Sequence, residues 1–303
     1  EIRFCDWSSD VCSSDLGTTA LAHDQPAHYR ARTGERLNIG NALSRSDASP
    51  QHRVKIPRKN RSMQLRLDRM IVLGALALLT AIGWLYLVMW PMPMPDGTDV
   101  TALSYAGLTI VMWFLMMVAM MVPAVTPVVM LFDRVSQQTT TRLPRTLSFV
   151  GGYLSAWLAF SGAVSLLQLA LIRIGWIDTM GVTQHRPVTA VLLVAVGIYQ
   201  WLPLKSACLE HCRSPLQFLT HRYRRGLFGA WCMGLEHGLY CVGCCWLLML
   251  LLFVGGVMNL WWVAGIAILV SVEKLLPHGE FIARIAGAAA VVVGMALLIK
   301  SIG

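Results

Sequence analysis

The sequence predicts an all-α fold, a polytopic bundle of transmembrane helices that follows a disordered N-terminal tail. Of its 303 residues 56% are hydrophobic and 14% are charged, whereas about a quarter of the residues in an ordinary soluble domain are charged. About half of the charged side chains stand in residues 1–69, and long uncharged runs fill the remainder. This composition argues against a soluble enzyme. The net charge of +9 arises without a basic face for nucleic acid, so no nucleic-acid partner is expected.

The uncharged runs are long enough to cross a bilayer, which takes about 20 residues of helix. The run after His237 is too long for one crossing, and the turn signal at 255–259 divides it. We expect about seven spans, within a range of six to eight. They lie at about 70–90, 103–124, 147–172, 188–204, 230–256, 260–276 and 281–299.

The N-terminal region is read separately from the spans. Residues 1–16 resemble the translation of a short-read sequencing adapter, so they are set aside from the motif analysis. Residues 17–68 are polar and basic without a sustained apolar period, which predicts a disordered tail. The adapter-like segment makes the authenticity of this tail doubtful. Residues 69–303 form the predicted transmembrane domain.

The distribution of positive charge predicts the topology. Basic residues precede the first span, whereas the connection after it contains Asp96 and Asp99 without Lys or Arg. The positive-inside rule then puts the N-terminus in the cytoplasm. The same rule places the basic connection 205–225 on the cytoplasmic side.

Six cysteines gather within 38 residues, and outside residues 1–16 the sequence has no others. Cys208 and Cys212 are spaced i and i+4, so one helical turn puts both thiols on one face. At 100° per residue, His237 shares one helix flank with Cys241, Cys244 and Cys245. The predicted metal ligands are Cys208, Cys212, Cys241, Cys244, Cys245 and His237, with His211 and Met233 as accessory donors. Cys232 points the opposite way and is predicted to lie in the core.

Thiolate, imidazole and thioether donors suit copper(I) or zinc rather than magnesium or calcium. Three other readings of the cluster remain open. The cysteines can be small residues that pack tightly between helices, together with Gly234, Gly238 and Gly243. Cys241 and Cys244 can form a redox dithiol. A structural zinc site is the third alternative.

Methionines and two acids mark other parts of the apolar sequence. The second span carries a stripe over about half of the helix circumference, made of Met112, Met116, Met117, Met120 and Met121. The stripe is either flexible core packing or a weak path for a soft metal. Glu236 and Glu273 are accessory metal candidates, or they reach toward the headgroups. Lys274 follows Glu273 directly and so cannot face it on a helix.

Several sequence blocks occur together in an order that is specific. They are Met112-Trp113 with Met116-Met117-Val118-Ala119-Met120-Met121-Val122-Pro123, Gly152-Tyr153, Gly197-Ile198-Tyr199-Gln200 with Pro203-Leu204-Lys205 and Cys208 to Cys212, and Met233-Gly234-Leu235-Glu236-His237-Gly238-Leu239-Tyr240-Cys241-Val242-Gly243-Cys244-Cys245-Trp246, which continues to Val257-Met258-Asn259-Leu260 and Glu273-Lys274-Leu275. With them the sequence resembles, over about 105–300, a bacterial family of predicted metal-binding integral membrane proteins without an established activity. The resemblance implies an all-helical protein of the bacterial inner membrane that binds a metal and is linked to copper.

These observations predict a membrane protein that takes up, holds or passes copper(I). Its partners are the lipid bilayer and a protein that delivers or accepts the metal. A membrane thiol-disulfide oxidoreductase and a structural zinc protein are the alternatives. The sequence contains no nucleotide-binding loop, Ser-His-Asp set or pair of catalytic carboxylates, so enzyme activity is not favoured.

Overall fold

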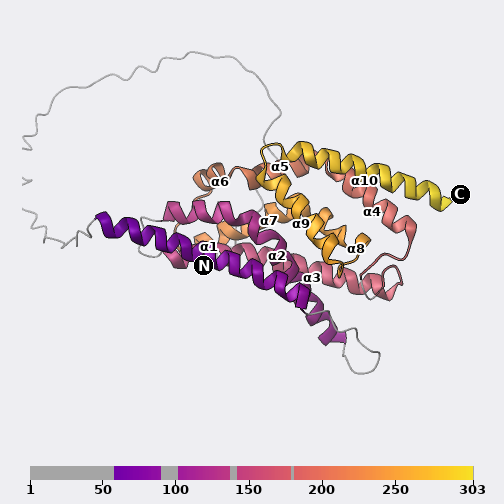
Figure 1. Ribbon diagram of the computed structural model, residues 1–303, viewed down its shortest axis with the longest axis horizontal. Helices are drawn as coiled ribbons and strands as arrows, with labels where there is room; N and C mark the ends of the chain where they lie inside the picture. The colour runs from indigo at the N-terminus through magenta and orange to yellow at the C-terminus, as the bar shows by residue number, and fades with distance from the viewer. Residues whose placement is uncertain (1–57, 90–101, 137–141, 179–180, 303) are drawn as a thin grey trace, which may run out of the picture. The chain divides into compact units, whose positions relative to one another are not determined.

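The computed structural model describes residues 58–89, 102–136, 142–178 and 181–302. In these residues the regular structure is helical, as the sequence predicts, and Ile177 and Thr183 form an isolated bridge. The helices are α1 (Arg58–Met89), α2 (Ala102–Val135), α3 (Arg142–Arg173), α4 (Arg186–Tyr199), α5 (Pro203–Arg213), α6 (Pro215–His221), α7 (Gly226–Leu250), α8 (Leu252–Gly255), α9 (Leu260–Leu275) and α10 (Gly279–Ile302) (Figure 1).

Five helical segments are long and apolar enough to cross a membrane by length and composition. They are Arg69–Met89, Tyr105–Val135, Arg142–Arg173, Gly226–Gly255 and Gly279–Ser301. A sixth arises if α4 and α5, which meet at a bend of 62°, count as one broken span. Six is the lower end of the expected range. The sixth expected span, 260–276, forms α9, which has 16 residues and is short for a crossing of about 20 residues.

The expected adapter-like segment and the tail through residue 57 lie outside the described residues. The last part of the expected tail, from Arg58 onward, is the start of α1. Arg, Lys, Gln, Met and Leu dominate this stretch and are good helix formers. Because these residues favour a helix, α1 begins inside the segment that was expected, from its polarity, to belong to the tail.

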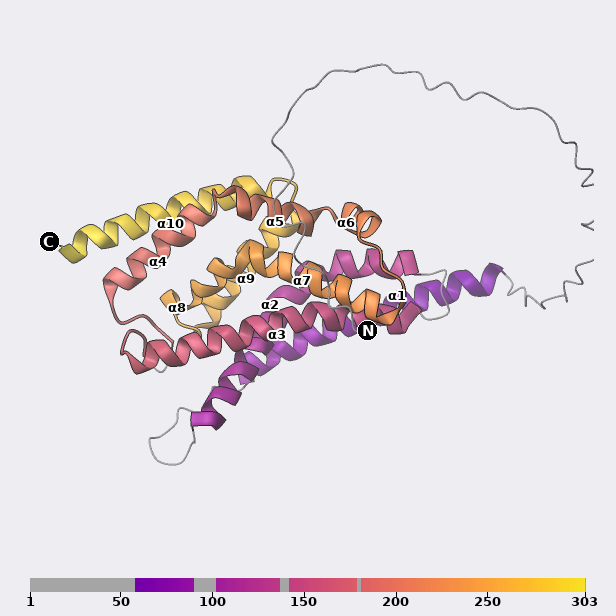
Figure 2. The ribbon, with the colours of Figure 1, turned by 180° about the vertical axis from the view of Figure 1, so that it is seen from behind.

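Helices α3 and α7 run side by side and approach each other at backbone distance (Figure 1, Figure 2). A Cβ atom on Gly234 would stand 1.9 Å from the carbonyl oxygen of Phe149, and one on Gly152 would stand 2.0 Å from that of Trp231. Only glycine fits at such contacts. The small-residue packing foreseen for Gly234 and Gly238 is therefore confirmed.

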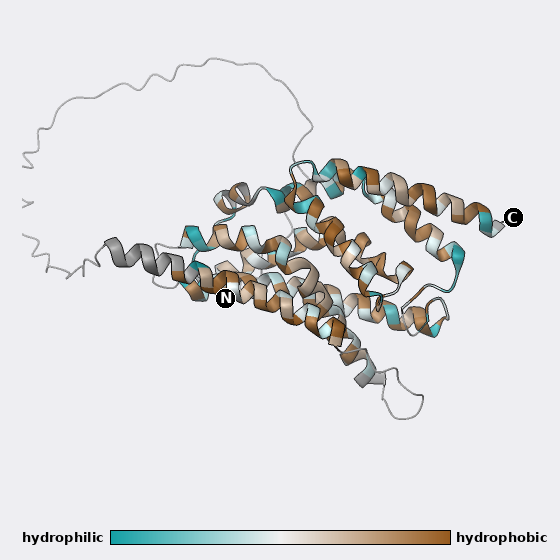
Figure 3. Ribbon diagram, viewed as in Figure 1, coloured by the Kyte–Doolittle hydropathy of each residue, from teal (hydrophilic) through white to brown (hydrophobic). Residues whose placement is uncertain are grey.

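A second close pair consists of α4 and α10 (Figure 2). A Cβ atom on Gly197 would stand 2.6 Å from the carbonyl oxygen of Gly287. α10 leaves apolar side chains on its outer surface, among them Phe281, Val292 and Ile299. Hydrophobic residues cover most of these helices, and hydrophilic residues gather near the helix ends (Figure 3).

The long apolar run after His237 is divided where the sequence predicted. α8 ends at Gly255, Gly256 takes a φ of 92° that favours glycine, and Asn259 caps α9 by accepting a hydrogen bond from the backbone N–H of Trp262. α9 then folds back along α7 and α2. This reversal brings the end of α9 to the middle of α7.

Candidate metal site

Two helices supply the thiols of the candidate site. α5 starts at Pro203, which lacks a backbone N–H and is suited to the first helical turn. The bend before Pro203 turns α5 toward α7, and the two helices pack together. α5 carries Cys208 and Cys212, while α7 carries the remaining thiols of the site. Cys208, Cys212, Cys241, Cys244 and Cys245 are free cysteines.

The sulfur cluster consists of Cys212, Cys241, Cys244 and Cys245. The thiol of Cys212 lies within hydrogen-bonding reach of those of Cys241 and Cys244, and Cys245 is in reach of the same two. Cys244 and Cys245 also donate to the backbone carbonyl of Cys241, at 3.1 Å and 2.9 Å. The Cys212 thiol of α5 therefore lies beside the thiols of α7.

An ammonium group reaches into the sulfur cluster from α9. Lys274 Nζ lies 2.9 Å from Cys241 Sγ, 3.7 Å from Cys245 Sγ and 3.6 Å from Met121 Sδ. The hydroxyl of Tyr153 lies 3.1 Å from Cys241 Sγ. Cys241 is thus the sulfur with the richest hydrogen bonding, contacted by α3 and α9.

His237 precedes Cys241 by one helical turn, and 2% of its surface is exposed. Its ring lies among those of Phe149, Tyr153 and Phe218, at centroid distances of 6.3, 6.1 and 5.4 Å. Within the described part of the chain, its Nδ1 has no hydrogen-bond partner. An orphaned buried nitrogen is costly, and a neutral imidazole nitrogen can act as a ligand by donating its lone pair to a soft metal ion.

Four other candidates lie beside the sulfur cluster rather than in it. Cys208 Sγ would stand 3.1 Å from a Cβ on Gly243, so it rests against the backbone of α7. His211 stacks on the ring of Tyr240 at 4.5 Å. The sulfur of Met233 accepts the backbone N–H of Arg224 at 3.2 Å. Glu236 forms an ion pair with Arg222 at 3.4 Å.

The methionine stripe is buried along α2. Met112, Met116, Met117, Met120 and Met121 all belong to the hydrophobic core. Among them, Met121 reaches the cluster through its contact with Lys274. The burial of the stripe agrees with packing, and the role of its sulfurs as a metal path stays a prediction.

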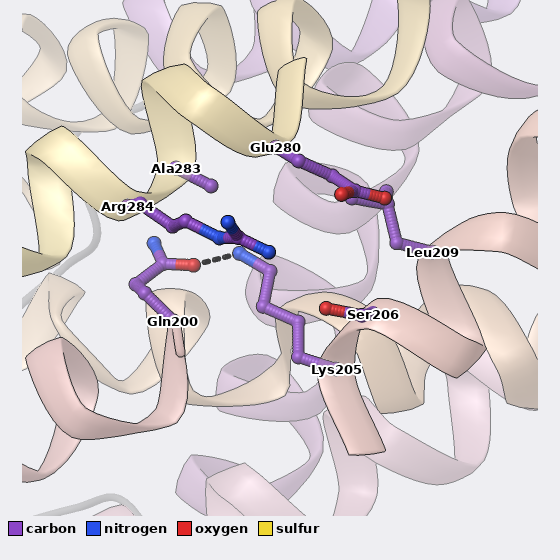
Figure 4. A pocket seen from close by; sticks show the side chains of 7 residues that line it. All are labelled: Gln200, Lys205, Ser206, Leu209, Glu280, Ala283 and Arg284. Carbon is purple, nitrogen blue, oxygen red and sulfur yellow. Dashed lines mark hydrogen bonds between the residues drawn. The ribbon is translucent and has the colours of Figure 1, made fainter. Parts of the chain in front are cut away.

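Glu273 turns away from the sulfur cluster, and its partners differ from those of the adjacent Lys274. Its carboxylate pairs with Lys205 at 2.7 Å and accepts a hydrogen bond from Gln200 at 3.1 Å. Lys205 also donates to the side-chain oxygen of Gln200, beside a small pocket at the start of α10 (Figure 4). Glu273 is therefore neutralised inside the protein, and its expected separation from Lys274 is confirmed.

The thiols do not enclose a coordination sphere as they stand. Among the described residues, no group of three or more His, Cys, Asp or Glu side chains is arranged to hold a metal ion. The sulfurs are instead spread around their hydrogen bonds to Lys274, Tyr153 and the carbonyl of Cys241.

Residues 110–297 match the PpoB2 family, which is described as a copper chaperone. The chain belongs to the PpoB2 copper chaperone family. The match begins in α2, ends in α10 and includes the sulfur cluster, His237 and Lys274. The resemblance to a copper-related family is thus confirmed, and copper handling is the activity of the family. No curated protein and no solved structure matches the chain.

Two residues in contact with the sulfur cluster, Tyr153 and Lys274, were not among the site residues predicted from the sequence. An ionisable residue inside an apolar run is a functional candidate by default, and that signal applies to Lys274 as much as to Glu273. Tyr153 stands in the Gly152-Tyr153 block of the family resemblance, but its contact with Cys241 depends on the packing of α3 against α7 and does not follow from that block. Lys205, the partner of Glu273, was assigned to the basic connection instead.

Proposed function

We propose that the protein is embedded in the bacterial inner membrane and holds one copper(I) ion in the sulfur cluster, from which the ion passes to a partner protein. The observation that carries the proposal is the meeting of the Cys212 thiol from α5 with the thiols of Cys241, Cys244 and Cys245 from α7. Membership of a copper chaperone family supports copper as the metal that is bound.

The donor chemistry supports copper(I) over harder ions. Thiolates and thioethers select copper(I), whereas carboxylates and carbonyls suit magnesium and calcium. The two nearby carboxylates are already paired with Arg222 and Lys205. His237, one helical turn before Cys241, adds a buried Nδ1 that has no hydrogen-bond partner in the described part of the chain. An ion at this point is therefore surrounded by soft donors and aromatic rings.

The proposed route to the cluster follows α2. Met121 ends the methionine stripe at the cluster, and thioethers bind copper(I) weakly enough to release it.

A membrane location is supported by five helical segments with the length and composition of spans. The outer faces of α1 and α10 carry exposed apolar side chains that lipid would cover. The positive-inside rule puts the N-terminus in the cytoplasm.

Metal analysis of the detergent-purified protein tests this function. After loading with copper(I) under anaerobic, reducing conditions, the wild type is expected to keep one copper per chain in elemental mass spectrometry. Cys241→Ser combined with Cys244→Ser is expected to lose it. Size-exclusion chromatography and helical circular dichroism of the double variant control for loss of the fold. Equal copper in the double variant contradicts the proposal.

The same preparation separates the alternatives. Zinc that stays bound during an excess of copper(I) would indicate a structural zinc site. A disulfide between Cys241 and Cys244, trapped by alkylation in intact cells, would indicate a thiol oxidoreductase. The proposal expects thiols that copper protects from alkylation.

A further inference from the structure

Lys274 is a buried cation whose neighbours are unusual. Only 9% of its surface is exposed, and its ammonium contacts the sulfurs of Cys241, Cys245 and Met121. Within the described ranges, no carboxylate forms an ion pair with it, because Glu273 is engaged by Lys205. A buried charge is tolerated when it is paired. The charge that balances Lys274 must therefore come from the sulfur cluster.

The ammonium cannot itself bind a metal, since it has three N–H donors and no free electron pair. Its positive charge can, however, favour a bound metal ion that forms a negatively charged complex with the thiolates. Cysteine binds metals as the thiolate. One copper(I) ion on two thiolates carries a net charge of −1, and the ammonium of Lys274 makes the assembly neutral. A divalent ion on the same two thiolates is already neutral, and Lys274 would leave it with an excess positive charge.

We propose that Lys274 is the specificity-determining residue of the sulfur cluster, whose fixed positive charge favours a monovalent soft ion on two thiolates over a divalent ion. The inference rests on the proposed function, because it assumes that copper occupies this cluster. It is carried by the position of Nζ, 2.9 Å from Cys241 Sγ with no competing carboxylate in the described structure. Hydrogen bonds from the ammonium to the bound sulfurs would keep Lys274 beside the loaded site.

The test compares the purified full-length wild type with Lys274→Met and Lys274→Arg. Each protein is loaded with copper(I) and, separately, with zinc, and is then titrated with a chelator that competes for the metal. Methionine keeps the length of the side chain and removes its charge. Lys274→Met is expected to weaken copper(I) retention by at least about tenfold, because one partner of a buried charge pair is lost. Zinc retention should not fall, and Lys274→Arg should stay within about threefold of the wild type for copper.

The matched control neutralises the other buried lysine. Lys205→Met combined with Glu273→Gln removes a complete ion pair outside the sulfur cluster and should leave copper retention unchanged. Size-exclusion chromatography and helical circular dichroism confirm that each variant is folded. Unchanged or tighter copper binding in folded Lys274→Met overturns the inference, as does an equal loss of zinc and copper or an equal copper loss in Lys274→Arg.

These results are distinguishable from failure of the proposed function. If the wild type holds copper that the Cys241/Cys244 double variant loses, while Lys274→Met matches the wild type, only the inference about Lys274 is wrong. If the wild type holds no copper, or if the cysteine variant keeps it, both proposals fail together.

Discussion

Two adjacent residues of α9, Glu273 and Lys274, lead to two different kinds of buried charge. Glu273 ends in a complete ion pair with Lys205, supported by Gln200. Lys274 ends among the sulfur atoms of α2 and α7, without a carboxylate in the described structure. The charge of Glu273 is balanced by Lys205 within the protein. The charge balance of Lys274 depends on the ionisation of the thiols and on any ion bound to them. The ion pair stabilises the fold, and the sulfur region is free to respond to a ligand.

The largest loss of stability is expected when Lys205 is replaced. Lys205→Met leaves the carboxylate of Glu273 buried and alone, and this should lower the free energy of unfolding by about 3–5 kcal/mol. Denaturant unfolding in detergent, followed by circular dichroism, measures the loss. Adding Glu273→Gln should restore most of the stability. A folded single variant with wild-type stability would mean that water reaches Glu273.

The second largest effect on stability is expected for Lys274→Met. The sulfurs left behind can remain neutral thiols, which tolerate apolar surroundings, so the loss should be about 1.5–3 kcal/mol. The same unfolding assay on copper-free protein measures it. A loss larger than that of Lys205→Met would reverse the comparison and give Lys274 the greater structural role.

Tyr153→Phe sharpens the description of the sulfur side. The variant removes the hydroxyl that contacts Cys241 Sγ at 3.1 Å and keeps the ring that faces His237. The free energy of copper(I) binding should become weaker by about 0.5–1.5 kcal/mol, as is typical for one hydrogen bond. Competition with a chelator measures the change. Tighter binding would show that the hydroxyl restrains the thiol instead of supporting it.

The smallest effect is expected for Cys208→Ser. Cys208 shares α5 with Cys212 but rests against Gly243 beside the cluster. Copper(I) binding should weaken less than in Cys212→Ser, because the Cys208 sulfur packs against Gly243. The chelator titration used for Tyr153→Phe provides the measurement, with Cys212→Ser as the comparison. A large loss would mean that Cys208 joins the cluster when copper is bound.

Local sequence signals predicted the helices and the convergence of thiols. Spacing alone put Cys208 with Cys212 on one face and Cys241 with Cys245 on another, and the turn at 255–259 divided the long apolar run. The contacts of Lys274 could not be predicted in this way. They depend on how far α9 folds back between α2 and α7, which is set by packing over long sequence distances. The pairing of Glu273 with Lys205 depends on the same long-range arrangement.

The glycine contacts between α3 and α7 have a consequence for the rigidity of the sulfur cluster. Backbones that touch at Gly152 and Gly234 leave no room to slide, so the wall that bears Cys241, Cys244 and Cys245 is fixed. Cys212 belongs to α5, which is joined to α4 through a sharp bend. The four thiols of the cluster are therefore held in two ways, three of them by tightly packed helices and the fourth by a bent helix pair.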